Sequence, residues 1–410
     1  MDIERFVAAT FQIGNFEAVL PGGRRLRAGD GSGPPVVVRI TDRVTLARLI
    51  AQTSLGAGEA YMDGRLLMER GSIYDLVALT AMNLALRKPK PAGTLRRLVA
   101  SGMRERNHRL SSRRNVAHHY DLPVDLYRTF LDEDLQYSCA YFQRPDMSLE
   151  QAQVAKKRHI IAKLDIPRNG GGEGPRVLDI GCGWGGLALS LAAWTGARVH
   201  GVTLSTEQLQ TAQARAQAAG LTHRAEFSLT DYRDAKGPYD RIVSVGMFEH
   251  VGRPNYQAFF DKIADLLADD GVALIHSIGR GEGPSTTDPF TAKYIFPGGY
   301  IPALSEVLPA VERAGLWVTD IEILRLHYAE TIKAWRERFA AHRARLAETY
   351  DERFCRMWEF YLAGAEVSFR YGRQMNFQLQ LTKRRDALPL TRDYIGDNER
   401  LLRKAREKAA

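Results

Sequence analysis

Cysteine is scarce in this sequence, whose 410 residues include only three, at positions 139, 182 and 355. Their wide spacing forms neither a disulfide framework nor a zinc-ligand pattern, which favours a reducing, cytoplasmic location. The first residues show no secretory signal pattern, and no apolar run approaches the roughly 18 residues of a membrane-spanning helix. With 45% hydrophobic and 26% charged residues, the composition excludes a disordered, collagen-like or membrane-spanning chain. It predicts a folded protein of two domains or one large domain.

The formal net charge of +9 has a local origin. Residues 87–114 contain ten Lys or Arg side chains and one acid, Glu105, whereas the rest of the chain holds 47 basic and 47 acidic side chains. Such a cluster suits a nucleic acid or an anionic membrane surface, unless it is a solvated linker with incidental charge. Aromatic residues that could stack on bases are absent from this segment, and no nucleic-acid-binding motif appears. The sequence therefore favours a membrane surface and no nucleic acid.

Residues 1–86 predict a small α+β domain. Two short strands around a Pro-Gly-Gly turn are expected within residues 16–27, a third strand at 36–40, and helices at 46–50 and 73–86. The basic segment follows this domain. We therefore expect a small first domain at 1–86, a basic connector at 87–117 and a larger body at 118–410.

From about residue 148 the sequence alternates between helical and strand patterns. Ser148 and Gln151 have the spacing of a capping box, which predicts a helix that reaches about Leu164. Strands are expected at 176–180, 198–203, 224–229, 239–245, 271–277 and 317–324, and helices at 186–195, 206–219, 256–267 and 304–314. This alternation predicts an α/β fold with a parallel, doubly wound, Rossmann-like sheet. The last eighty residues are expected to be mostly helical.

A glycine-rich turn lies between the first predicted strand of this body and its helix. Gly181, Gly183 and Gly186 have the GxGxxG spacing that lets a nucleotide approach the backbone at a helix N-terminus. A dinucleotide-binding fold would require an acid at the tip of the second strand, and this sequence has none there. Instead Asp179 precedes the glycines and Asp231 follows the third strand. Acids at these places favour a cationic cofactor, and the pattern resembles S-adenosylmethionine-dependent methyltransferases more than dehydrogenases. A glycine-rich turn of another doubly wound protein is the alternative.

Further segments narrow the resemblance. They are VAHHYDLPVDLY (116–127), QYSCAYF (136–142), GVTLSTEQ (201–208), IVSVGMFEHVG (242–252), YIFPGGYI (294–301), LHYAETIKAWRERF (326–339) and RMWEFYL (356–362). Together they resemble the cyclopropane-fatty-acyl-phospholipid synthases, relatives of the mycolic acid cyclopropane synthases. The resemblance runs from about residue 116 to 380, and GEAYMDG (58–64) extends it into the first domain. It implies a lipid-associated first domain and an S-adenosylmethionine-dependent catalytic domain.

The resemblance also implies a reaction. Enzymes of this family transfer a methylene group from S-adenosylmethionine to the cis double bond of unsaturated acyl chains in membrane phospholipids. A carbocation forms on the chain, and a bound bicarbonate ion removes the proton that lets the cyclopropane ring close. A related enzyme that gives a methylene- or methyl-branched chain is the alternative. Other methyltransferases and a catalytically silent lipid-binding protein are disfavoured, because the residues matched to the bicarbonate site are all retained.

Site residues follow from the same match. The catalytic set, matched to the bicarbonate site, is Cys139, Glu249, His276, Ile278 (through its backbone) and Tyr328. The cofactor-binding set is Tyr137, Ser138, Asp179, Gly181, Gly183, Thr203, Leu204, Gln208, Asp231 and Tyr232. His276 and Tyr328 can donate hydrogen bonds to bicarbonate, and Glu249 can either accept from its hydroxyl or orient His276. Cys139 is interpreted as a weak donor.

Three further expectations complete the interpretation. The tandem histidines 118 and 119 lack a third ligand with suitable spacing, so no metal site is expected. The family resemblance suggests a homodimer. The basic segment 87–114 is expected to attach the protein peripherally to the inner face of an anionic membrane, from which the acyl substrate is taken.

Overall fold

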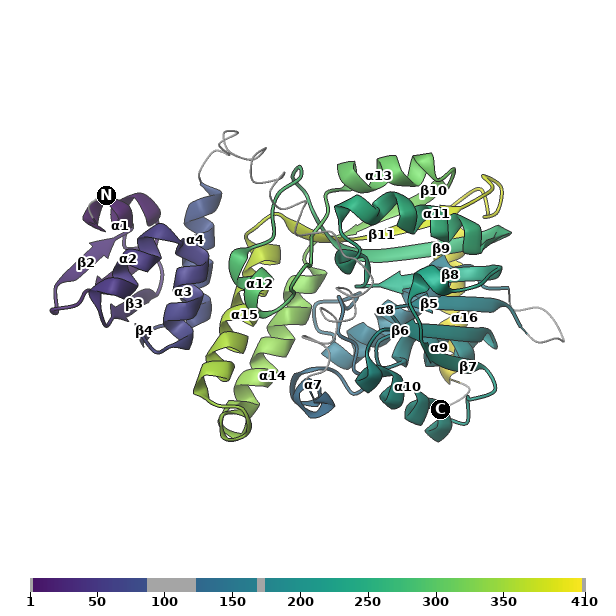
Figure 1. The fold of residues 1–410 in the computed structure, drawn as a ribbon, viewed down its shortest axis with the longest axis horizontal. Coiled ribbons are helices and arrows are strands. Elements are labelled where there is room, and N and C mark those ends of the chain that lie inside the picture. Colours follow the sequence, from purple (N-terminus) through teal and green to yellow (C-terminus); the bar gives the residue numbers. More distant parts are fainter. Residues whose placement is uncertain (1–2, 87–122, 168–173, 408–410) are drawn as a thin grey trace. The chain divides into compact units, whose positions relative to one another are not determined.

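The computed structural model describes residues 3–86, 123–167 and 174–407 (Figure 1). These residues belong to two compact units. The first combines the N-terminal residues with 287–297 and 329–373, and the second contains the described residues of 123–286, 298–328 and 374–407. The basic connector expected at 87–117 and the histidines at 118 and 119 lie outside the described residues. The first unit thus draws two later segments of the chain to the N-terminal residues.

The first unit is built around a four-stranded sheet in the order β2-β1-β3-β4. β1 pairs antiparallel with β2 and parallel with β3, and β3 pairs antiparallel with β4. The strands are β1 (Asn15–Val19), β2 (Arg25–Ala28), β3 (Pro35–Ile40) and β4 (Leu66–Arg70). The helices are α1 (Ile3–Thr10), α2 (Arg43–Ala51), α3 (Thr53–Met62), α4 (Ile73–Ala85), α12 (Pro289–Tyr294), most of α14 (His327–Thr349) and α15 (Glu352–Arg370). The hairpin expected around the Pro-Gly-Gly turn is therefore confirmed.

Later helices complete the core of the first unit. α15 packs against α3 and α4, and Phe290 of α12 and Phe360 of α15 join the same buried cluster as Phe16 of β1. Gly58 of α3 lies so close to this cluster that a Cβ atom there would come within 2.3 Å of the Phe290 ring. The first glycine of the GEAYMDG segment, Gly58, is therefore explained by close packing between helices.

The second unit contains a seven-stranded sheet in the order β10-β11-β9-β8-β5-β6-β7. β5 to β9 run parallel to one another, and β11 pairs antiparallel with both β9 and β10. The strands are β5 (Arg176–Ile180), β6 (Arg198–Thr203), β7 (Ala225–Leu229), β8 (Tyr239–Val245), β9 (Leu267–Arg280), β10 (Trp317–Leu324) and β11 (Gln374–Thr382). The predicted α/β fold with a doubly wound sheet is confirmed.

Helices cover both faces of this sheet (Figure 1). The helices of this unit are α7 (Val124–Phe130), α8 (Leu149–Lys163), α9 (Gly186–Thr195), α10 (Thr206–Ala218), α11 (Tyr256–Leu266), α13 (Leu304–Arg313) and α16 (Asp393–Glu407). Neighbouring residues of β5 belong to opposite layers: Leu178 packs with α11 and α13, and Val177 packs with α8, α9 and α10. Both faces of the sheet are therefore buried, which explains its nearly continuous apolar strands. Within the described ranges, no helix is both long and apolar enough to cross a membrane.

β11 is the main element that the sequence did not predict, because the last eighty residues were expected to be mostly helical. It lies between β9 and β10, and every residue from Met375 to Thr382 is buried. Its apolar residues alternate with Asn and Gln residues whose side chains are buried as well. A strand with polar residues at every second position is normally half exposed, so the burial of this polar face calls for polar partners inside the unit.

Helix α8 presents an unusual number of polar side chains to the interior. Its capping box is confirmed, because Ser148 Oγ accepts from Gln151 N at 3.3 Å and Ser148 N donates to Gln151 Oε1 at 3.2 Å. Further along the helix, His159 lies between Glu322 and Glu399 at 2.6 and 2.5 Å. Charged groups buried in this way are costly unless they are paired, and these pairs fix α8 against β10 and α16.

Candidate functional site

A cavity of about 230 Å³ lies at the carboxyl ends of the parallel strands of the second unit. Its walls come from the turns that follow β5, β6, β7 and β8 and from the segment that precedes α8. Ligands of open α/β sheets bind at this edge of the sheet. All ten residues predicted to bind the cofactor line this one cavity: Tyr137, Ser138, Asp179, Gly181, Gly183, Thr203, Leu204, Gln208, Asp231 and Tyr232.

The glycine-rich turn forms the floor between β5 and α9. Gly181 has a φ of +78° and donates its N–H to Val202 O at 2.9 Å, which ties the turn to β6. Gly186 is required for a different reason, because a Cβ atom there would lie 2.4 Å from Gln136 Nε2 and 2.5 Å from Asp134 Oδ2. The last glycine of the GxGxxG pattern therefore lets the segment before α8 approach the cavity.

Asp179 gives the cavity a buried acid. Its side chain is 2% exposed, and its Oδ2 atom has no hydrogen-bond partner in the described structure. Burial raises the pKa of this carboxyl to about 7. A buried, unpartnered carboxylate favours a cationic ligand, because a positive charge would offset the cost of its desolvation.

Two other polar residues of the wall, Thr203 and Asp231, already have partners. Thr203 Oγ1 donates to Gln208 Oε1 at 2.9 Å, and the Asp231 carboxylate accepts from Arg233 Nε at 2.8 Å. Asp231 therefore contributes less net negative charge to the cavity than Asp179. These contacts fix the conformation of the turns that follow β6 and β7.

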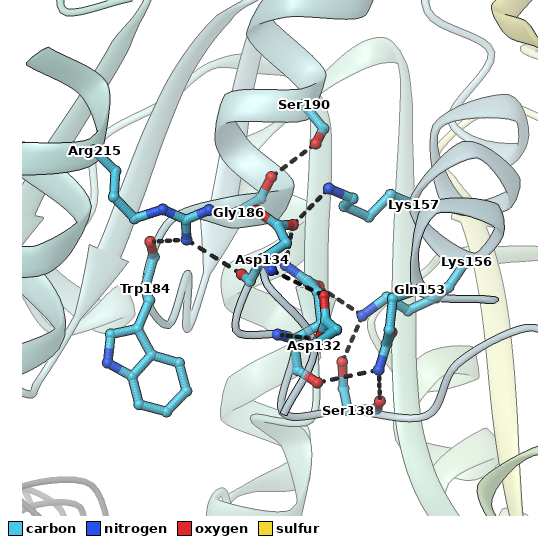
Figure 2. A network of polar contacts seen from close by, with 11 residues as sticks. Asp132, Asp134, Ser138, Gln153, Lys156, Lys157, Trp184, Gly186, Ser190 and Arg215 are labelled. Atoms are coloured by element: carbon cyan, nitrogen blue, oxygen red, sulfur yellow. Dashed lines mark hydrogen bonds and ion pairs between the residues drawn. The ribbon is translucent and has the colours of Figure 1, made fainter. Parts of the chain in front are cut away.

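A partly buried polar network supports the segment that precedes α8 (Figure 2). Asp134 pairs with Lys157 at 2.5 Å and with Arg215, and Arg215 Nη1 also donates to Trp184 O at 2.8 Å. This network connects α8 and α10 to the glycine-rich turn. It fixes one wall of the cavity before any ligand binds.

The residues predicted to be catalytic lie outside the set that lines this cavity, but two of them are in contact. Glu249 follows β8, and its Oε1 atom accepts from Ile278 N of β9 at 2.6 Å. Glu249 Oε2 has no hydrogen-bond partner in the described structure, and burial raises the pKa of the carboxyl to about 7. Glu249 is thus a buried acid at the carboxyl ends of two adjacent parallel strands, and its neighbour His250 lines the cavity.

His276 is oriented by β11. The amide groups of Gln378 and Asn376 lie 3.2 Å from its Nδ1 and 3.4 Å from its Nε2. Burial lowers the pKa of the imidazole to about 3, so the ring is neutral. The sequence left two roles open for Glu249, and one of them was to orient His276. Among the described residues, no hydrogen bond joins Glu249 to His276. Asn376 and Gln378 hold the ring instead.

Cys139 and Tyr328 belong to neighbouring segments. Cys139 is fully buried, its Sγ lies 3.4 Å from Ala140 O, and burial raises its pKa, so it is a thiol. Tyr328 lies at the start of α14 and is 9% exposed. The adjacent His327 accepts a hydrogen bond from Phe142 N at 3.0 Å through Nδ1, which connects the start of α14 to the segment that contains Cys139.

Sequence reasoning missed several residues at this site. The sequence predicts no role for His250, but this residue lines the cavity, where burial lowers its pKa to about 4. Trp184 also lines the cavity, and its place inside the glycine-rich turn was a signal that could have been used. No such signal exists for Asn376 and Gln378, which contact His276, or for Lys156, which contacts Ser138 of the cavity wall. These contacts depend on burial by distant parts of the chain.

The doubly wound sheet, its glycine-rich turn and the acid-containing cavity define the class as a Rossmann-like enzyme that binds a nucleotide-type cofactor. The family described as mycolic acid cyclopropane synthetase matches residues 107–379 of the chain. The protein belongs to this family. The family, the fold class and the class of enzyme predicted from the sequence are thereby confirmed.

Similar proteins cover most of the chain. A cyclopropane-fatty-acyl-phospholipid synthase of Escherichia coli is 38% identical over 349 residues, which are 84% of this chain and 87% of that protein. A tuberculostearic acid methyltransferase of Mycobacterium tuberculosis is 38% identical over 374 residues, covering 86% of this chain and 84% of that protein. Because both matches exceed the length of the second unit, the likeness includes residues of the first unit.

Solved structures agree with these matches. The cyclopropane synthase MmaA2 from Mycobacterium tuberculosis is 33% identical with a TM-score of 0.62, and the match covers 66% of this chain and 97% of that one. The mycolic acid cyclopropane synthase CmaA1 in complex with SAH and CTAB is 33% identical with a TM-score of 0.61 and has the same coverage. Coclaurine N-methyltransferase, at 21% identity and a TM-score of 0.65, shows the fold alone.

Proposed function

We propose that the protein is a cyclopropane-fatty-acyl-phospholipid synthase. It uses S-adenosylmethionine to add one methylene group across the cis double bond of an unsaturated acyl chain in a phospholipid. The observation that carries the proposal is the cavity at the carboxyl ends of the strands, lined by all ten residues matched to methyl-donor binding. Family membership and the likeness to a phospholipid enzyme along most of the chain support the choice of substrate.

The residues of the cavity fit a cationic nucleoside cofactor. The unpartnered Asp179 carboxylate suits a positive charge, and the glycine-rich turn leaves room for a nucleoside against the backbone. When bound, S-adenosylmethionine supplies an electrophilic methyl group. Tyr137, Ser138, Gly181, Gly183, Thr203, Leu204, Gln208, Asp231 and Tyr232 would hold it together with Asp179.

Ring closure requires the added carbon to lose a proton, and the buried residues around Glu249 fit a small anionic base. We propose bicarbonate for this role, because the Tyr328 hydroxyl can donate a hydrogen bond to an anion. The single N–H of a neutral His276 can donate a second one once the ion replaces one of the two amide contacts of the ring. The thiol of Cys139 can add a weaker one. Glu249, through its unpartnered Oε2 atom, accepts the bicarbonate hydroxyl hydrogen and so favours its basic form. The backbone at Ile278 keeps Glu249 in place.

The substrate class is tested with purified protein, S-adenosylmethionine and vesicles of monounsaturated phospholipid. We expect the phospholipid to gain the mass of one CH2 unit per double bond, and the gain to require added bicarbonate in carbon-dioxide-free buffer. Vesicles of fully saturated phospholipid are the control and should not change in mass. No gain with any unsaturated lipid would defeat the proposal, and a gain only with free fatty acids would remove phospholipid as the substrate.

Membrane attachment through residues 87–114 is part of the proposal and rests on charge alone, since these residues lie outside the described ones. Each Lys or Arg near an anionic surface adds about 1 kcal/mol of attraction. We expect a variant with the ten basic residues replaced by Gln to stop floating with anionic vesicles while it still turns over detergent-dispersed lipid. Neutral vesicles serve as the control. Unchanged flotation of the variant would show that another surface attaches the enzyme to the inner face of the membrane.

The homodimer suggested by the family resemblance also stays a proposal. Sedimentation of the purified full chain tests it directly, and a single species of monomer mass at assay concentrations would contradict it.

A further inference from the structure

Lys156 is a buried cation beside the cofactor cavity. It comes from α8, is 1% exposed and forms no ion pair with a carboxylate among the described residues, whereas the adjacent Lys157 pairs with Asp134 at 2.5 Å. Its Nζ atom instead donates to Gln136 Oε1 at 2.6 Å and to Ser138 Oγ at 2.8 Å (Figure 2). Because burying an unpaired charge is costly, this arrangement needs a reason beyond packing.

The contact with Ser138 fixes the direction of a proton. An ammonium group has three donors and no acceptor, so the Ser138 hydroxyl can only accept from Lys156. The hydroxyl hydrogen must therefore point elsewhere, and no acceptor for it is present among the described residues. Ser138 lines the cavity. Within the described part of the chain, its hydroxyl hydrogen is therefore available to a ligand in the cavity.

Gln136, unlike Ser138, has protein partners for its side-chain oxygen, its side-chain nitrogen and its backbone nitrogen. Its Oε1 atom accepts from Lys156, its Nε2 atom donates to Asp134 Oδ2 at 2.9 Å, and its backbone N donates to Asp132 Oδ1 at 2.9 Å. Gln153 Nε2 donates to the carbonyl oxygens of Gln136 and Ser138 at 3.1 and 3.0 Å. These contacts fix the inner side of the segment, and the Ser138 hydroxyl is a polar group that the segment presents to the cavity.

The charge of Lys156 also affects the cavity. Burial and the repulsion of Lys157 lower the pKa of Lys156 to about 8, whereas the attraction of Asp132 and Asp134 raises it. The side chain is therefore mostly charged at neutral pH. A positive charge behind an outward-facing O–H favours an anionic acceptor at this end of the cavity. S-adenosylmethionine has one anionic group, the carboxylate of its amino-acid moiety.

We propose that Lys156 is a positioning residue for the methyl donor: it directs the Ser138 hydroxyl hydrogen into the cavity, where this hydrogen is donated to the carboxylate of the donor. This inference rests on the proposed function, since it assumes that the cavity binds S-adenosylmethionine. It assigns a direction to the bound donor, with its amino-acid end at Ser138. It also explains why α8 buries a lysine without a carboxylate partner.

Calorimetric titration of the full chain with two probes tests this inference. S-adenosylhomocysteine carries the carboxylate, and 5′-methylthioadenosine lacks the whole amino-acid moiety. We expect Lys156→Met to weaken binding of S-adenosylhomocysteine by roughly 10-fold, the loss of one hydrogen bond to a charged group, and to leave 5′-methylthioadenosine unchanged. Ser138→Ala should have the same selective effect. The double variant should lose no more than about twofold beyond Ser138→Ala, because both changes remove one interaction.

Arg158→Gln is the matched control, since it removes a positive charge from the same helix at a side chain that bonds Gln143 on the surface. It should bind both probes as the wild type does. Ser138→Ala leaves α8 intact, so the inference stays testable if Lys156→Met does not fold. Equal weakening of both probes, or additive effects in the double variant, would overturn the inference. Failure of the wild type to bind either probe would defeat the proposed function itself.

Discussion

Glu249→Gln is expected to lower kcat by roughly 100- to 10,000-fold, the usual contribution of a group that handles a proton in the transition state. The substitution keeps an oxygen that can accept from Ile278 N, which Glu249 contacts at 2.6 Å, but it removes the carboxylate that accepts the bicarbonate hydroxyl hydrogen. Binding of S-adenosylhomocysteine should change by less than about twofold, because Glu249 lies outside the residues that line the cofactor cavity. Glu249→Ala should also abolish turnover.

Steady-state turnover on phospholipid vesicles and calorimetric binding together check this result. Asp269→Asn is the matched control, because it removes a carboxylate that is 92% exposed from β9, the strand whose Ile278 N contacts Glu249, and its kcat should equal that of the wild type. Full activity of Glu249→Gln would remove Glu249 from the mechanism. Loss of binding and turnover together would indicate that Glu249 shapes the cavity and does not handle a proton.

Affinity for S-adenosylmethionine is expected to rise as the pH increases from 6 to 8. Burial raises the pKa of Asp179 to about 7, so this carboxyl is neutral below pH 7 and ionised above it. The ionised form favours the cationic donor, and binding at low pH must first release a proton. Below the pKa, affinity should fall by up to about tenfold per pH unit. S-adenosylhomocysteine, which lacks the sulfonium charge, should depend less on pH.

Asp179→Asn should bind S-adenosylmethionine weakly at every pH and lose this pH dependence. Asp265→Asn, at an exposed position of α11, is the control and should keep the wild-type profile. If Asp179→Asn retained the wild-type dependence, another group would be responsible for it. Equal pH profiles for the two ligands would show that Asp179 does not interact with the sulfonium charge.

The parallel part of the sheet could be predicted closely because its local patterns agree with the fold. The strands at 176–180, 198–203, 239–245 and 317–324 have the bounds that their apolar runs predicted. The cavity follows from these strands, since the turns at their carboxyl ends meet at one edge of the sheet. Asp179, Thr203 and Asp231 could therefore be placed together before the structure was known.

The interior polar residues could not be predicted, because their burial depends on distant parts of the chain. β11 alternates apolar residues with Asn and Gln, a pattern that usually marks one solvated face. In the structure Asn376 and Gln378 face His276, and Gln380 Nε2 donates to Tyr394 OH at 2.6 Å. Lys156 likewise has the local sequence of an exposed helix position. Only the fold shows that these polar side chains support the candidate site.

NMR of the lipid product tests the proposed reaction most directly. The full chain is incubated with monounsaturated phospholipid vesicles and S-adenosylmethionine whose methyl carbon is ¹³C. Formation of a cyclopropane predicts that the label appears as a ring CH2 group on the phospholipid acyl chain. Label in an exocyclic methylene or a methyl group would instead establish the branched-chain alternative, and unlabelled lipid would contradict acyl-chain methylene transfer altogether.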